Sequence, residues 1–175
     1  EFNFYDTHFR LLYEPSQKDY FRINFLALGN QLDFLENAII NGLSISRKSE
    51  LAQNNLSAGI YYKRKWNEKL VSDVQLYGSW YQLKATNFDI LNDQRLIQEN
   101  EVVESGIKLS SIYQFANTTS IQIGYQFNET GITNFEQINN PFFEKIDKQV
   151  IITNSLFTEL GHTLFQEQTL IKFGL

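Results

Sequence analysis

Few residues of this chain have the type and spacing that catalysis or metal binding requires. The 175 residues include no Cys, which excludes thiolate nucleophiles, disulfides and Cys-based metal sites. The two histidines, His8 and His162, lie far apart in the sequence, and no nearby His or Cys completes a transition-metal site. Neither a nucleophile elbow nor a glycine-rich phosphate loop is present. We therefore expect no enzyme activity, no cofactor and no metal.

One group of acidic residues supplies the oxygen ligands that calcium prefers. Its members are Asp89, Asp93, Glu99, Glu101 and Glu104. Their spacing does not match a calcium loop, so we interpret them as solvated acids. The net charge of −5 is scattered along the chain without a basic stripe, which argues against a nucleic-acid partner.

Two kinds of side chain in the longer polar segments are candidates for contact with a small ligand. Arg47, Lys48 and Arg95 are cations that could steer an anionic ligand. Phe142 and Phe143, directly behind a proline, offer aromatic faces for stacking on a flat ring. Solvated loop charges and packing of a loop on itself are the competing interpretations.

An alternation of apolar and polar side chains predicts the elements that position these residues. Residues 121–128 alternate cleanly, with four polar residues on one face and, on the other, Ile121, Ile123, Tyr125 and Phe127. The exceptions elsewhere are Tyr61, Ser111 and Ile112. The pattern predicts eight strands, the last unfinished, within residues 5–13, 21–27, 56–63, 74–81, 107–115, 121–128, 150–160 and 169–175.

Short polar turns recur about every fifty residues, with two strands and one longer polar segment between each pair of turns. The turns are residues 14–19, 67–69, 116–119 and 161–167, and the longer segments are 31–50, 86–100 and 130–147. This repeat is typical of the hairpins of a transmembrane β-barrel. We therefore predict an all-β antiparallel meander, with short turns in the periplasm and long extracellular loops that carry the candidate ligand residues.

The composition agrees with a barrel wall. The chain is 42% hydrophobic and 15% aromatic, yet its mean hydropathy is −0.33. Strands that alternate between lipid and water produce this average. Aromatic residues flank the turns, as an interfacial girdle requires, namely Tyr13, Tyr20, Trp66 and Phe115. A passive porin or small structural barrel and a soluble β-domain remain as alternatives, because a soluble sandwich also alternates.

The strand directions predict that the chain is part of a larger barrel. The first strand runs toward the turn at Pro15 and the last runs outward to Leu175, whereas a complete small barrel has both termini in the periplasm. We expect an open curved sheet in which residues 5–13 and 170–175 do not pair. The absence of Met and of a signal segment indicates a mature chain or an internal fragment.

Several segments of the sequence resemble the middle barrel strands of TonB-dependent outer-membrane receptors. They are PSQKDYFRIN at residues 15–24, SRKS at 46–49 followed by QNNL at 53–56, and YYKRKWN at 61–67. The closing Phe173, Gly174 and Leu175 resemble the family's Gly-Leu-Arg strand opening, without the Arg.

The resemblance implies a barrel of about 22 strands in the bacterial outer membrane, filled by an N-terminal plug domain. Such a receptor imports a scarce ligand, such as a ferric siderophore, cobalamin or a glycan, with energy passed through TonB. Residues 1–175 would then be a partial barrel domain, without the plug and the remaining strands. Its partners would be outer-membrane lipid, the ligand and, through a missing N-terminal region, TonB.

Overall fold

The computed structural model describes residues 1–40, 43–164 and 169–175. They form eight strands: β1 (Phe2–Tyr13), β2 (Asp19–Ile40), β3 (Leu43–Lys65), β4 (Leu70–Asp89), β5 (Gln94–Ala116), β6 (Thr119–Asn139), β7 (Phe142–Leu164) and β8 (Thr169–Gly174). Each predicted strand is present, and most lie inside a longer one. Among these residues, no helix is long and apolar enough to cross a membrane.

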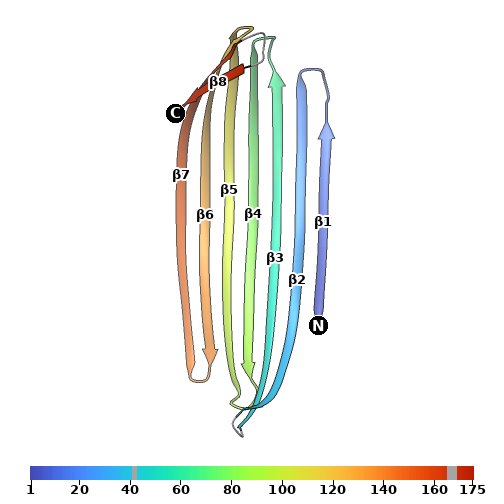
Figure 1. Cartoon of the computed structure of the whole chain (residues 1–175), viewed down its shortest axis with the longest axis vertical. Coiled ribbons are helices and arrows are strands. Elements are labelled where there is room, and N and C mark those ends of the chain that lie inside the picture. Colours follow the sequence, from blue (N-terminus) through green and yellow to red (C-terminus); the bar gives the residue numbers. More distant parts are fainter. Residues whose placement is uncertain (41–42, 165–168) are drawn as a thin grey trace.

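The eight strands form one antiparallel sheet in which each strand pairs with the next in the sequence (Figure 1). Within the described residues β1 and β8 do not pair with each other, so the sheet is open and has two free edges. The predicted open meander is therefore confirmed. The strands β2 to β7 are 20 to 23 residues long. At a rise of about 3.3 Å per residue, such strands extend for roughly 65 to 75 Å.

The reversals at both ends of the sheet are tight. At one end, which we call the near end, the chain turns at residues 14–18, 66–69 and 117–118. Three predicted short turns are thus confirmed, whereas in the fourth, at 161–167, residues 161–164 belong to β7 and the remainder lies outside the described residues. At the opposite, far end, the chain turns at residues 90–93 and 140–141.

The prediction of long loops at the far end is wrong. Residues 31–40 and 43–50 pair as β2 and β3, and most of residues 86–100 and 130–147 likewise belong to paired strands. The segments that were expected to be loops are extensions of the strands. Pairing satisfies their backbone hydrogen-bonding groups, so these extensions form without an apolar face.

Short polar side chains close the turns. The Asn67 Oδ1 atom accepts hydrogen bonds from the backbone N–H groups of Lys69 and Leu70, both at 2.9 Å. The Asp89 Oδ1 atom accepts from Leu91 and Asn92 at 3.1 and 3.2 Å. These are the local bonds through which Asn and Asp favour turns.

The sheet is a single layer without a core. No hydrophobic side chain is buried among the described residues, and the one buried polar side chain is Ser110. A β-sandwich would bury one face of this sheet against a second sheet. Here, no second layer of the described strands covers either face, so both faces are exposed.

Candidate functional site

The register places the apolar residues of successive strands side by side on one face, which we call the apolar face. Its apolar band comprises Phe9, Leu11 and Tyr13 of β1; Phe21, Ile23, Phe25 and Ala27 of β2; Leu56, Ala58, Ile60 and Tyr62 of β3; Val74, Leu76 and Trp80 of β4; Val103, Ile107, Leu109 and Tyr113 of β5; Ile121, Ile123, Tyr125 and Phe127 of β6; and Val150, Ile152, Leu156 and Leu160 of β7. Ile123 is 55% exposed and Leu156 is 81% exposed. Polar residues interrupt the band at Ser105, Asn154 and Thr158, and Tyr125 donates to Asn154 Oδ1 at 2.7 Å. A largely apolar surface of this extent marks a region that contacts protein or lipid.

Aromatic rings line the near-end edge of the band. The rings of Tyr13 and Phe21 lie 6.4 Å apart, and those of Phe21 and Tyr62 stack at 4.4 Å. Farther along this edge, the Tyr113 and Phe115 rings meet edge to face at 5.0 Å. Rings with polar tips suit a boundary between an apolar layer and water.

Hydrogen-bonded polar side chains mark the far-end edge of the band across neighbouring strands. Tyr5 donates to Asn54 Oδ1 at 3.5 Å, Asn54 donates to Gln82 Oε1 at 3.4 Å, and Gln82 donates to Glu99 Oε1 at 2.7 Å. Nearby, the Trp80 indole donates to Glu101 Oε2 at 2.9 Å. The apolar face therefore changes from apolar to polar within about two residues of each strand, while the strands themselves continue.

The edges of the band do not keep to one paired row in every strand. Phe21 is aligned with Tyr125 of β6 through the intervening strands, but the band begins at Phe21 in β2 and at Ile121 in β6. At the other edge, Ala27 is aligned with Gly131, but the band ends at Ala27 in β2 and at Phe127 in β6. The near-end edge moves by four residues in a single step, between Val74 of β4 and Tyr113 of β5. At the far-end edge the band ends in one paired row in β2, β3, β4, β5 and β7, at Ala27, Leu56, Trp80, Val103 and Val150, whereas in β1 and β6 it ends short of that row. The edges therefore follow the paired rows with local steps rather than a constant slope.

Two hydroxyl groups in the band satisfy each other. Ser111, an exception to the sequence alternation, lies on the apolar face opposite Ser72 of β4. Their Oγ atoms lie 2.8 Å apart. Because each hydroxyl has the other as its hydrogen-bond partner, both serines are compatible with an apolar environment.

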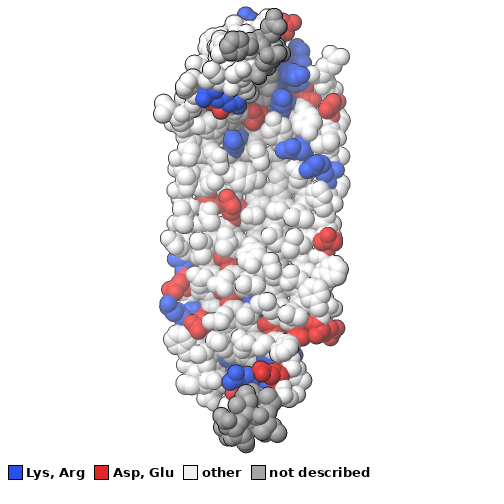
Figure 2. Space-filling model, viewed as in Figure 1, with Lys and Arg blue, Asp and Glu red and all other residues white. Residues whose placement is uncertain are grey.

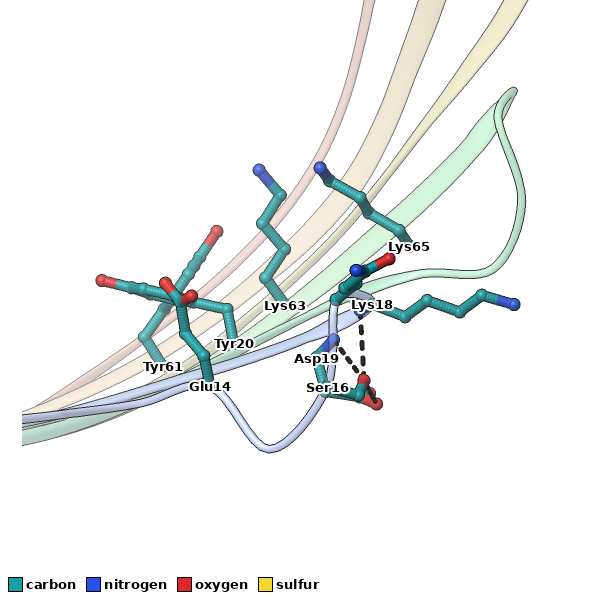
Figure 3. A pocket seen from close by; sticks show the side chains of 9 residues that line it. Glu14, Ser16, Lys18, Asp19, Tyr20, Tyr61, Lys63 and Lys65 are labelled. Carbon is teal, nitrogen blue, oxygen red and sulfur yellow. Dashed lines mark hydrogen bonds between the residues drawn. The ribbon is translucent and has the colours of Figure 1, made fainter.

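The opposite, polar face is concave. In Figure 3 the side chains of Tyr20, Tyr61, Lys63 and Lys65 rise from the side toward which the later strands bend. In the middle of this face, Gln126 donates to the Tyr77 hydroxyl at 3.1 Å, and Tyr77 donates to Asn128. Connected amide and hydroxyl groups therefore line the middle of this face.

Two glycines let aromatic rings lie flat on the polar face. A Cβ atom on Gly106 would lie 2.5 Å from the Tyr77 ring. A Cβ atom on Gly124 would overlap the Phe157 ring and lie 2.8 Å from the Leu109 carbonyl oxygen. Lys108 in turn lies over the Phe157 ring, with Nζ 5.3 Å from its centroid.

The five predicted ligand residues lie in strand extensions at the far end rather than in loops, and they do not form one site. Arg47 of β3 and Phe143 of β7 lie on the polar face, but they are separated by the three strands between β3 and β7. Lys48, Arg95 and Phe142 lie on the other face, where Lys48 pairs with Glu50. Arg47 lines an open pocket of about 350 Å³ together with Glu36, Ser49, Asn87 and Asp89. The Asn92 side chain donates to Asp89 and holds the pKa of this carboxyl below its usual value.

No metal site is formed by the described residues, since no three His, Asp or Glu side chains gather closely enough. The acids grouped in the sequence are separated in the structure. Glu99 and Glu101 accept hydrogen bonds on the apolar face, and Glu104 falls on the polar face. His162 forms a hydrogen bond with Thr119, with 2.8 Å between Nδ1 and Oγ1.

A second open pocket, of about 340 Å³, lies at the near end (Figure 3). Its lining comprises Glu14, Ser16, Gln17, Lys18, Asp19, Tyr20, Tyr61, Lys63 and Lys65. Sequence reasoning did not select these residues, although one signal was present. Tyr61 interrupts the alternation, and Lys63 and Lys65 follow on the same face at a spacing of two.

Comparison with known proteins adds no identification, since no family model matches the chain and no curated protein matches it either.

Proposed function

We propose that this chain forms part of the wall of a β-barrel in the bacterial outer membrane. The proposal is carried by the apolar band, which has aromatic rings at its near-end edge and hydrogen-bonded polar side chains at its far-end edge. From first to last residue, the band spans seven residues in β2 and eleven in β5. A tilted membrane-spanning strand needs about 9 to 11 residues, a length that the band reaches in β5 and β7, whereas it is shorter in β2, β3, β4 and β6.

The single-layer architecture supports the same proposal. An exposed apolar face and a polar concave face match a wall with lipid outside and a wet lumen inside. The free edges of β1 and β8 carry unpaired backbone groups, which lipid cannot satisfy. A complete wall therefore needs further strands beyond these eight.

We further propose that the barrel is a TonB-dependent receptor that imports a ferric siderophore, cobalamin or a glycan. This second proposal rests on the sequence segments that resemble the family, at residues 15–24, 46–56 and 61–67. The short turns of the near end would face the periplasm, and the strand extensions of the far end would project outside the cell. Arg47 and Phe143, on the inner wall of that projection, are the preferred candidates for ligand contact.

Cysteine labelling in the outer membrane tests the barrel wall. The described chain has no Cys, so Ile123→Cys and Gln122→Cys in a full-length protein without other cysteines give neighbouring probes on opposite faces. An environment-sensitive fluorophore should report an apolar surrounding at position 123 and a more polar one at position 122. Equal, water-like emission at both positions would rule out a lipid-facing band.

A binding experiment tests the receptor proposal separately. The periplasmic domain of TonB from the same cell should bind the purified full-length protein, as measured by a pull-down against an unrelated porin. Failure to bind would leave the barrel proposal intact and remove the importer, in favour of a passive porin or structural barrel.

A further inference from the structure

The pocket at the near end of the concave face contains cations without acidic partners. In Figure 3, Lys63 and Lys65 extend in the same direction from β3, while the Lys18 side chain extends outward from the turn, away from those two. Within the described part of the chain, none of these three lysines forms an ion pair. The backbone bond from the Lys65 N–H to the Lys18 carbonyl, at 2.8 Å, fixes the turn against β3.

Among the described residues, the acids near the pocket offset part of this positive charge but form no salt bridge with these lysines. Asp19 uses one carboxylate oxygen to accept from Ser16 at 2.7 Å and the other to accept from Tyr62 at 2.7 Å and Arg64 at 3.3 Å. Asp73, opposite Lys63 in the register, accepts from Ser110 at 2.6 Å. Glu14 is the remaining carboxylate in the pocket lining.

Further positive charge lies next to the pocket. The Arg22 guanidinium lies over the Tyr61 ring, with 5.0 Å from Cζ to the ring centroid. Its Nε atom is buried and makes no hydrogen bond within the described structure. Figure 2 shows Lys and Arg side chains toward this end of the molecule, with Asp and Glu side chains among them. Cations that outnumber the neighbouring acids create a positive potential that attracts anions.

We propose that this pocket, centred on Lys63 and Lys65, binds a carboxylate or phosphate group. Ammonium groups bind such oxygens as point charges, and the tyrosine hydroxyls of Tyr20 and Tyr61 supply further donors. A volume of about 340 Å³ accommodates a small polyanion or the anionic end of a larger molecule. This proposal rests on the charges and the shape of the concave face and does not depend on the proposed membrane function.

Calorimetric titration of the purified full-length protein with citrate and with inorganic pyrophosphate tests the site. Binding should weaken at least tenfold in the Lys63→Gln/Lys65→Gln variant and should fall as salt is raised. Lys148→Gln in β7, on the opposite face, is the matched control and should leave affinity unchanged. Lys63→Arg/Lys65→Arg should retain binding, which separates loss of charge from loss of folding.

The anion has two possible sources, a free solute or an acidic side chain of the same protein. Binding of free citrate or pyrophosphate by the wild type supports the first source. If neither binds, carbodiimide coupling of Lys63 or Lys65 to an Asp or Glu elsewhere in the full-length protein supports the second. The proposal is overturned if there is neither binding nor coupling, or if Lys148→Gln weakens binding as much as the double variant.

Discussion

The near-end and far-end halves of the strands share one backbone structure but carry different side-chain patterns. In the near-end half, apolar residues occupy one face and polar residues the other, as in Ile121 to Asn128. In the far-end half, the apolar face becomes polar at Asn54 and Gln82, while the pairing continues without interruption. Alternation in the sequence therefore shows where the two faces of a strand meet different environments. Backbone pairing is not limited to that segment and continues beyond it.

The largest expected effect comes from a charge in the middle of the band. In the full-length protein in lipid vesicles, Ile123→Arg should lower the free energy of unfolding by about 2–4 kcal/mol, because lipid cannot solvate the guanidinium. Gln122→Arg, one residue away on the concave face, should have a much smaller effect. Urea titration measures both, and equal losses would show that the two faces share one environment.

A smaller effect is expected where a ring covers a glycine on the concave face. Gly124→Ala places a methyl group against the Phe157 ring and the Leu109 carbonyl, so overpacking should cost about 1–3 kcal/mol. Gly131→Ala is the control, because its Cβ would have only the Val103 carbonyl within 4 Å, at 3.9 Å. The free energies of unfolding of the two variants check this, and a Gly131→Ala loss as large as that of Gly124→Ala would contradict it.

The serine pair offers a test of what surrounds the band. Ser72→Ala removes the partner of the Ser111 hydroxyl and should cost about 1 kcal/mol in an apolar environment, because that hydroxyl is left unpaired. Replacing both serines with Ala should restore stability to near that of the wild type. Additive losses in a double-mutant cycle would indicate that water reaches both hydroxyls.

The smallest effect concerns pH at the near-end turn, beyond the band. Hydrogen bonds from Ser16 and then Tyr62 hold the pKa of Asp19 below its usual value of 3.8. A depressed folded-state pKa adds stability above the unfolded value, and this stability is lost as pH falls from about 3.8 through the folded pKa. Asp19→Asn should therefore flatten the dependence of stability on pH below 4, measured by unfolding at several pH values. An unchanged pH dependence would show that Asp19 makes no such contribution.

The sequence predicted the fold class, the eight strands and most near-end turns, because each depends on local alternation or turn chemistry. It did not predict that residues 31–40 and 43–50 form strands, since pairing satisfies the backbone there while both faces tolerate polar residues. Nor did it predict the near-end pocket. Lys18 and Lys65 lie far apart in the sequence, and only the pairing of β2 with β3 and the adjoining turn bring them together. Arg47, Lys48 and Arg95 looked equivalent as charges, but the register assigns Arg47 to a different face from the other two.

The alternation of side chains within the band limits how the sequence of such a wall can change in length. One residue inserted within the band would exchange the two faces of everything that follows in that strand. Changes in length are therefore expected to accumulate beyond the band, where both faces of β2 and β3 mix apolar and polar residues and a shifted face has little consequence.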